Sequence, residues 1–245
     1  MINIIIGEGL NKNTLKATKE FEKNPNINIK TVKTNQELLK AIKNPNINAV
    51  IRGSLPAKNI IQNIKKTHSN TKINRSTIIN GEKDKFLLTP VGIDEGTSLE
   101  NKKELIKQNI EFLENLEKTP KIAILAKGRK DDKNRSQIID QSLKESEKLT
   151  KEIQKEYPQY QITNYYILIE KAIQEKNNII ICPDGIIGNI IFRTLVLMNK
   201  WPSMGAITLG IPEIYIDTSR DQSTETYIRS IKLAYYLSKK SQDIK

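Results

Sequence analysis

The sequence is poor in sulfur, histidine and aromatic side chains. Its 245 residues include one cysteine, one histidine and one tryptophan, and aromatic residues make up 5% of the chain. A lone cysteine, Cys182, excludes an internal disulfide, agrees with a reducing compartment and leaves too little sulfur for a metal site. We therefore expect no bound metal and interpret Cys182 as a small buried residue. His68 follows two lysines at a predicted helix end, where it would complement the helix C-terminus.

Long apolar runs are also missing. No stretch approaches the roughly 18 apolar residues of a membrane-spanning helix. The amino-terminal segment MINIIIGEGLNKN places its apolar part at residue 2 without a basic leader before it. We therefore expect a soluble, cytoplasmic protein that has no membrane partner.

The chain is basic, with a formal net charge of +12. Lysines are spread over every predicted helix and occur with many asparagines and isoleucines, which suggests an A/T-rich coding bias more than a selected patch. There is little aromatic surface for stacking bases and no nucleic-acid motif. We expect no nucleic-acid partner, whereas a small anionic ligand stays open.

Strands and helices alternate along most of the sequence, which indicates an α/β protein. Two strand pairs, 76–79 with 86–91 and 206–209 with 213–217, are too close together for a helical crossover and predict hairpins. These hairpins argue against the alternative fold, a (β/α)₈ barrel. Residues 92–96 are a candidate hinge before a long helix at 98–116. The other predicted strands are 2–6, 27–32, 48–51, 122–126, 162–163 and 179–182.

The segment 179–197, IIICPDGIIGNIIFRTLVL, is a candidate ligand site. An apolar strand ends at Pro183, Asp184-Gly185 is a turn signal, and Gly188 and Asn189 fall in the first turn of a helix. Free N–H groups at a helix start favour an anion. The alternative is an ordinary connection whose glycines make room for packing. Apolar residues at three- and four-residue spacing predict one buried helix face, made of Ile187, Ile190, Ile191, Thr194, Leu195 and Met198.

Two further polar segments follow predicted strands. Arg52-Gly53-Ser54-Leu55-Pro56 comes directly after strand 48–51, at the sheet edge where open α/β proteins bind ligands. Arg52 and Ser54 are therefore candidate anion contacts, although a solvated arginine is the simpler interpretation. The last strand delivers Asp217-Thr218-Ser219-Arg220-Asp221 before a helix at 223–237.

The densest cationic loop is AKGRKDDKNRS at 126–136, which contains Lys127 and Arg129. A solvated loop and a phosphate-bearing ligand are both compatible with it. It contains no complete P-loop motif. The glycines at 7 and 9 resemble a dinucleotide turn but lack the third glycine and the acidic residue after the next strand, which counts against a dinucleotide or S-adenosylmethionine site.

Three segments together resemble a known superfamily: PDGIIGNIIFRTL, IYIDTSRDQSTE and AVIRGSLPAKNI. They are similar to the cleft motifs of the phosphate acetyl/butyryltransferase superfamily, which includes phosphotransacetylases and PlsX-like acyltransferases. More narrowly, nearly the whole chain resembles the MtxX-type methanogenesis marker proteins of archaea, which are described as methyltransferases because of their gene neighbourhood.

The resemblance implies two α/β domains with an interdomain cleft, as in isocitrate and isopropylmalate dehydrogenases. The first domain would contain residues 1–88 plus 218–245, and the second would contain 89–217. It also implies a homodimer.

The resemblance further implies site residues. Ser219 and Arg220 match a Ser-Arg pair at the thioester and phosphate, and with Asp184 they are the expected catalytic residues. The expected substrate-binding residues are Arg52, Ser54, Lys127, Arg129, Gly185, Gly188, Asn189 and Asp221. One departure is Thr226, which stands where phosphotransacetylases carry the acid proposed as general base, unless Glu225 or Asp221 substitutes.

Three functions are compatible with these residues. The first is acyl transfer between phosphate and a thiol, with coenzyme A or phosphate as substrate and no tightly bound cofactor. The alternative is methyl transfer linked to methanogenesis, with a corrinoid or coenzyme M and with methyltransferase or corrinoid protein subunits as partners. The third is a binding or regulatory homologue that has lost catalysis.

Overall fold

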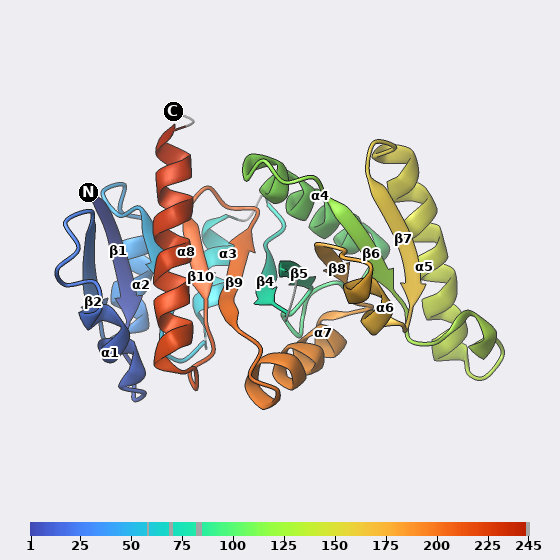
Figure 1. Ribbon diagram of the computed structural model, residues 1–245, viewed down its shortest axis with the longest axis horizontal. Coiled ribbons are helices and arrows are strands. Elements are labelled where there is room, and N and C mark those ends of the chain that lie inside the picture. The colour runs from blue at the N-terminus through green and yellow to red at the C-terminus, as the bar shows by residue number, and fades with distance from the viewer. Residues whose placement is uncertain (58, 69–70, 82–84, 244–245) are drawn as a thin grey trace. The chain divides into compact units, whose positions relative to one another are not determined.

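The computed structural model describes residues 1–57, 59–68, 71–81 and 85–243 and divides into two compact units (Figure 1). Unit 1 consists of Met1–Ile73 and Ser203–Lys245, and unit 2 consists of Asn74–Pro202. The expected boundaries were 88/89 and 217/218. The contacts keep each hairpin whole, so that the first hairpin belongs to unit 2 and the second to unit 1. The sequence predicts a helix at 57–66, and Lys58 within this range lies outside the described residues.

The strands of unit 1 lie in the order β2-β1-β3-β10-β9. β1 is parallel to β2 and β3, β10 is parallel to β3, and β9 runs antiparallel to β10. The carboxyl ends of β1, β3 and β10 therefore lie side by side at one edge. The bounds are β1 Ile2–Gly7, β2 Ile27–Val32, β3 Ala49–Ile51, β9 Ser203–Leu209 and β10 Ile214–Asp217.

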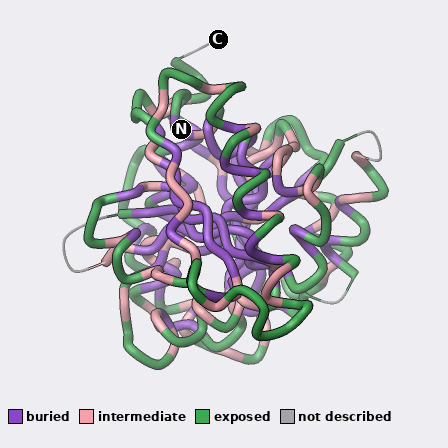
Figure 2. The backbone as a smooth tube through the Cα atoms, turned by 90° about the vertical axis from the view of Figure 1, so that its right-hand side faces the viewer, coloured by how far each residue is buried: buried purple, intermediate pink, exposed green. Residues whose placement is uncertain are grey.

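Helices cover both faces of this sheet. α2 (Asn35–Ile42) and α3 (Ile60–Thr67) bury their apolar stripes against Ile5, Val50 and Tyr215. On the other face α8 (Thr224–Asp243) packs along β1, β3 and β9 and against α1 (Asn13–Lys19). Burial of both faces explains why β1, β3 and β10 are nearly continuous apolar runs. Figure 2 shows the buried stretches of the backbone in purple.

The strands of unit 2 lie in the order β4-β5-β8-β6-β7. β4 and β5 form an antiparallel hairpin, and β5, β8, β6 and β7 are parallel. Both predicted hairpins are thus confirmed, and the strand order is open at both ends and does not close into a barrel. The bounds are β4 Asn74–Asn80, β5 Lys85–Thr89, β6 Lys121–Leu125, β7 Gln161–Tyr166 and β8 Ile179–Ile181.

The helices of unit 2 cover both faces of its sheet. Because parallel crossovers are right-handed, the connections from β5 to β6 and from β6 to β7 place α4 and α5 on one face, and the return to β8 places α6 on the other. α7 packs against β5 and continues into a π-helical segment, η2. The bounds are α4 Leu99–Asn115, α5 Gln137–Glu156, α6 Ile169–Gln174, α7 Gly185–Phe192 and η2 Arg193–Met198, and a 3₁₀ turn, η1, covers Lys130–Asp132.

Two sequence-based expectations for unit 2 are wrong. The expected hinge at 92–96 lies inside the unit, where the Glu95 carboxylate accepts hydrogen bonds from Arg75 and from the Gly92 amide. None of the six residues of the expected buried face, which lie on α7 and η2, is buried, and Ile190 and Met198 are 58% and 78% exposed. Among the described residues, no helix is long and apolar enough to cross a membrane.

Candidate functional site

The polar loops of unit 1 gather where β1, β3 and β10 end. Since these strands are adjacent and parallel, the loops after them share one edge of the sheet. Hydrogen bonds connect the loops: the Ser54 amide donates to the Gly7 carbonyl at 3.0 Å, and the Thr218 hydroxyl donates to the Gly53 carbonyl at 2.8 Å. Gly53 has a φ of +61°, and a Cβ there would meet the Gly7 carbonyl oxygen at 1.9 Å. The loops are therefore in direct backbone contact.

Arg52 is buried under these loops and is 7% exposed. Its Nε donates to Oδ1 of Asp217, which is 9% exposed, and its Nη1 donates to the Leu55 carbonyl at 2.8 Å. The guanidinium therefore binds the neighbouring strand end and its own loop. This geometry gives Arg52 a positioning role in the strand-end loops.

Ser54 is also engaged internally. Its Oγ accepts from the Gly9 amide at 2.8 Å and from the Thr14 hydroxyl at 3.0 Å, and it donates to the Asn11 carbonyl at 3.2 Å. The side chain is 3% exposed and joins the loop after β3 to the loop after β1. Its hydroxyl is thus saturated by protein groups.

Ser219 and Arg220 lie on the outside of the same edge. Hydrogen bonds hold their backbone in place: the buried Tyr227 hydroxyl donates to the Ser219 carbonyl at 3.0 Å and to the Arg220 carbonyl at 3.1 Å. Asn11 donates to the Arg220 carbonyl at 2.9 Å. Ser219 is half-buried and Arg220 is exposed, and within the described ranges neither side chain makes a hydrogen bond or an ion pair. Both side chains can therefore meet a ligand.

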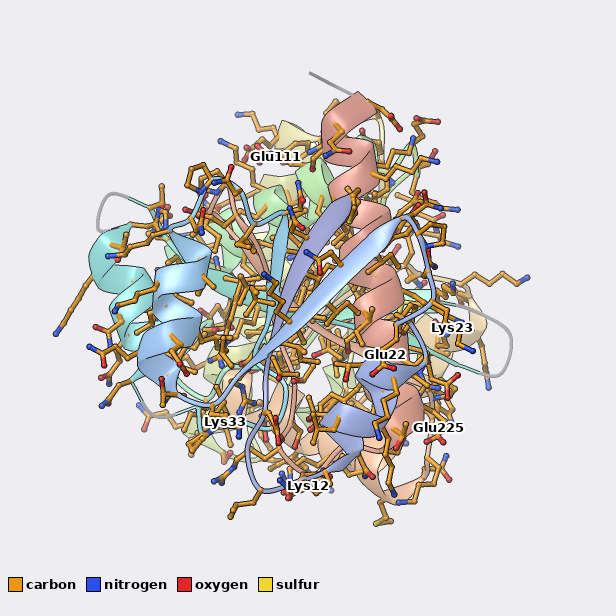
Figure 3. All side chains as sticks on the ribbon, turned by 90° about the vertical axis from the view of Figure 1, so that its left-hand side faces the viewer. Lys12, Glu22, Lys23, Lys33, Glu111 and Glu225 are labelled. Atoms are coloured by element: carbon orange, nitrogen blue, oxygen red, sulfur yellow. The ribbon has the colours of Figure 1, made fainter. Side chains whose placement is uncertain are left out.

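Thr226, which stands where the acid is expected, and the two acids that could substitute for it lie near the start of α8. Thr226 is buried, and its Oγ1 accepts from Arg229 Nη2 at 2.9 Å. The backbone amide of Glu225 and the Ser223 hydroxyl hold the pKa of the Glu225 carboxyl below its ordinary value, which weakens it as a base. Asp221 is exposed. Glu225 and Lys12 both project near the end of unit 1 at which β1 ends (Figure 3).

Unit 2 brings a cation and an anion together at the ends of β6 and β8. Lys127 Nζ lies 2.8 Å from Asp184 Oδ2, and the two side chains are 35% and 23% exposed. Burial raises the pKa of Asp184, but the hydrogen bonds from Lys127 and from the Ile187 amide outweigh it, so the pKa lies below its ordinary value. The Asp184 carboxyl is therefore ionised at neutral pH. Burial, followed by the nearby Asp184, raises the pKa of the Cys182 thiol, which makes it unreactive.

Protein groups already accept hydrogen bonds from the backbone amides at the start of α7. Asp184 is the N-cap and its Oδ1 accepts from the Ile187 amide at 2.9 Å, while the Gly185 amide donates to the Glu95 carbonyl at 3.1 Å. These amides, expected to receive an anion, already have partners. Asn189 Nδ2 likewise donates to the Val91 carbonyl at 2.9 Å.

The glycines of α7 allow close packing. A Cβ on Gly185 would lie 1.6 Å from the Gly92 carbonyl oxygen, and one on Gly188 would lie 1.9 Å from that of Pro90. The helix therefore rests directly on the loop after β5. The structure therefore supports the interpretation of Gly185 and Gly188 as residues that make room for packing.

Arg129 lies in the exposed part of the cationic loop. Its backbone amide donates to Asp132 Oδ2 at 2.7 Å, and Arg135 Nη1 lies 2.5 Å from Asp132 Oδ1. Asp132 thus folds the loop over itself and neutralises part of its charge, leaving the Arg129 side chain at the surface.

The candidate residues fall into two groups. Arg52, Ser54, Ser219, Arg220 and Asp221 gather within unit 1. The second group lies within unit 2 and consists of Lys127, Arg129, Asp184, Gly185, Gly188 and Asn189.

Sequence reasoning missed three residues that shape these groups. Tyr227 holds the Ser219–Arg220 backbone, and Glu95 organises the loop under α7. Glu8 is 8% exposed after β1 and pairs with Lys12 at 3.3 Å. Of these three, only Glu8 could have been found from the sequence, because an acid directly after a strand lies at the sheet edge where open α/β proteins bind ligands.

The chain has clear relatives by sequence. No profile of a known protein family matches it. It is 33% identical over 242 residues to an uncharacterized methyltransferase of Methanocaldococcus jannaschii, covering 95% of this chain and 96% of that protein. It is 34% identical over 175 residues to a protein of Methanosarcina mazei provisionally named methyltransferase mtx subunit X, covering 71% of this chain but 61% of that protein.

Solved structures share the fold at low identity. A branched-chain phosphotransacylase of Enterococcus faecalis superposes with a TM-score of 0.74 and 17% identity, covering 97% of this chain and 99% of that one. A beta-decarboxylating dehydrogenase of Thermococcus kodakarensis gives a TM-score of 0.53 and 10% identity, covering 96% and 84%. The fold is the α/β fold of phosphotransacetylases and isocitrate/isopropylmalate-type dehydrogenases. With a full-length relative at this identity, the chain belongs to the methanogen family of MtxX-type proteins named as methyltransferases.

Proposed function

We propose that this protein is a transferase that binds a phosphate- or coenzyme A-type anion and moves an acyl group between phosphate and a thiol. The observation that carries the proposal is the Ser219–Arg220 loop. Its backbone is held by Tyr227 and Asn11, and its two side chains are available to a ligand. A fixed loop with a free guanidinium at a strand-end edge is suited to an anionic substrate.

The chemistry requires two polar contacts. A phosphate oxygen attacks the carbonyl carbon of a thioester, the C–S bond breaks, and the thiolate leaves and takes up a proton. Arg220 can hold two oxygens of the phosphate, and the Ser219 hydroxyl can donate to the carbonyl oxygen as negative charge develops there. The whole-chain likeness to a phosphotransacylase supports this assignment at the level of the fold.

Proton transfer would depend on Asp221, because the position of the expected acid is occupied by Thr226. Thr226 cannot accept the thiol proton in the reverse direction, and Glu225 is a weakened base. Asp221, next to the Ser219–Arg220 pair and exposed, is the remaining acid on this loop. Loss of a positioned base typically costs about 10² to 10⁴-fold in rate, so turnover should be slow.

The test is release of free thiol from a series of acyl-coenzyme A thioesters in the presence of phosphate. The buried Cys182 should stay silent to the thiol reagent. Arg220→Ala and Ser219→Ala should each lower kcat/KM by about 10²-fold, the effect of removing one transition-state donor. Lys16→Ala is the matched control, because it removes an exposed cation on α1. Absence of turnover with every thioester would contradict the proposal.

Methyl transfer is the second candidate, and the names of the sequence relatives favour it. A corrinoid would then reside on a partner subunit, since His68, the single histidine, ends α3 with its Nε2 3.2 Å from Glu213. The word subunit in one relative's name supports such a partner. Methyl product from a methylated corrinoid protein, without thiol release from thioesters, would favour this function over the first.

A melting-temperature measurement on the same purified protein distinguishes a binding or regulatory role from catalysis. Phosphate or coenzyme A would then raise the melting temperature by mass action while no group is transferred. Arg220→Ala should abolish that shift, and Lys16→Ala should keep it.

A further inference from the structure

The positive charge of the chain is concentrated in unit 1. This unit contains 19 of the 40 lysines and arginines but 9 of the 28 aspartates and glutamates, which gives it a formal charge of +10. Unit 2 contains 21 basic and 19 acidic residues and has a formal charge of +2. A coding bias acts on both units alike, so it does not explain this difference. An excess of one sign on one unit indicates a partner of the opposite sign.

Half of this charge comes from the segment 12–43, which contains α1, β2 and α2. The segment has eight lysines and three glutamates, and it has no arginine or aspartate. All eight lysines are exposed, and within the described residues Lys12, paired with Glu8, is the one that makes an ion pair. Glu37 is engaged elsewhere, because its carboxylate accepts from the Lys33 amide at 3.0 Å. The lysines without an ion pair are Lys16, Lys19, Lys23, Lys30, Lys33, Lys40 and Lys43.

These lysines surround β2, which is the edge strand of unit 1. β2 stands at the end of the strand order and, among the described residues, pairs with β1 alone. Lys30 lies on the strand, and Lys23 and Lys33 come before and after it. Figure 3 looks onto this side of unit 1, where Lys12, Lys23 and Lys33 are labelled. We call β2 with the lysines of the segment 12–43 the β2 edge.

The outer backbone groups of β2 are available for pairing. The Glu8 amide donates to the Val32 carbonyl at 2.7 Å, so the backbone of Val32 faces β1. Because successive residues of a strand turn their backbone groups to opposite sides, Ile29 and Thr31 direct their N–H and C=O groups away from β1. In the part of the chain that the structure describes, these groups have no hydrogen-bond partner. The β2 edge therefore combines unpaired backbone groups with unpaired cations.

We propose that the β2 edge binds an acidic, extended segment of a partner protein. Such a segment adds to the sheet as a further strand: its backbone pairs with Ile29 and Thr31, and its carboxylates meet the surrounding lysines. Backbone pairing requires a peptide, which distinguishes this partner from a nucleic acid. The one aromatic side chain in the segment 12–43 is Phe21, which is buried and offers no stacking surface to bases. The proposal is independent of the group that the protein transfers.

The charge contact is tested with a dye-labelled peptide of alternating glutamate and valine, six residues long like β2. Fluorescence anisotropy with the full chain should show binding at low salt that weakens as salt rises, because salt screens exposed charges. Lys30→Glu combined with Lys33→Glu should weaken binding by about 10-fold. The matched control is Lys144→Glu combined with Lys151→Glu, which makes the same change of charge at exposed positions of α5 in unit 2.

The backbone contact is tested at Thr31. Thr31→Pro removes an outward N–H and leaves the hydrogen bonds to β1 intact, so it should weaken binding by about 5-fold. Thr31→Ala keeps the N–H and is the matched control, which should bind like the wild type. The same peptide with every peptide nitrogen methylated tests the contact without any change in the protein, and it should also bind more weakly.

The outcomes separate the possible partners. Binding that is weakened both by the lysine reversals in the β2 edge and by methylation of the peptide supports the proposal. No binding of the acidic peptide at low salt overturns it and leaves the lysines as protection against strand pairing. Equal binding of the plain and the methylated peptide overturns it as well, because charge alone would then hold the peptide. A labelled single-stranded oligonucleotide that binds where the peptide does not would assign the surface to nucleic acid and overturn the proposal.

Discussion

The Lys127 ammonium lies 2.8 Å from the Asp184 carboxylate, and this contact joins the end of β6 to the start of α7. Asp184 uses one oxygen for Lys127 and the other for the Ile187 amide. One carboxylate therefore caps a helix and neutralises the lysine of the cationic loop. The arrangement stabilises unit 2 and keeps the Lys127 side chain in place at the surface.

Asp184→Ala should lower the free energy of unfolding at pH 7 by about 1 kcal/mol, the usual effect of losing an N-cap. Asp184→Asn should lose less, because asparagine is also a good cap. The pKa of Asp184 is lower in the folded protein than its ordinary value of 3.8. Its stabilisation is therefore complete above that value and is lost as the pH falls through the folded-state pKa. Urea unfolding at pH 7 and at acid pH measures this, and an equal difference at both would contradict it.

Arg52→Ala should destabilise unit 1 strongly. It removes the cation that contacts the buried Asp217 carboxylate, and breaking a buried pair typically costs about 3–5 kcal/mol. Arg52→Ala combined with Asp217→Ala should recover part of the loss in a double-mutant cycle followed by urea unfolding. Additive losses would show that the two side chains are not coupled.

Tyr227→Phe should loosen the Ser219–Arg220 loop while α8 stays in place. It removes the hydroxyl that donates to both carbonyls, and a loss of about 1 kcal/mol is expected for such a hydrogen bond. Burial raises the pKa of Tyr227, so the phenol stays protonated at neutral pH and can donate. Hydrogen exchange should rise at 219–222 and stay unchanged in β6. Equal exchange in wild type and variant would exclude the holding role.

Gly188→Ala should destabilise unit 2, although alanine is the better helix former. The new Cβ would lie 1.9 Å from the Pro90 carbonyl oxygen, and such overpacking typically costs about 1–3 kcal/mol. Ile186→Ala on the same helix is the control, since Ile186 is 58% exposed and its truncation should cost little stability. Thermal unfolding compares them, and a Gly188→Ala variant as stable as the wild type would refute the close packing.

Local sequence patterns predicted the strands and long helices well because periodicity records which faces are buried. The apolar runs of β1 and β8 follow directly from that rule. Short spacing also predicted both hairpins. The same rule failed for α7, where isoleucines at 186, 187, 190 and 191 fit more than one buried face. Glycine contacts with the loop after β5 select the face, and no local pattern shows them.

The sequence by itself determined that polar residues follow buried strands, and hence which loops could form a site. It placed Arg52 and Ser219-Arg220 at strand ends because each follows closely on an apolar stretch of strand-forming residues. Only the tertiary structure decided which side chains are available. Arg52 is taken up by Asp217, 165 residues away, while Arg220 is left exposed. Contacts between residues so distant in sequence depend on how the strands are ordered in the sheet, and local composition does not encode that order.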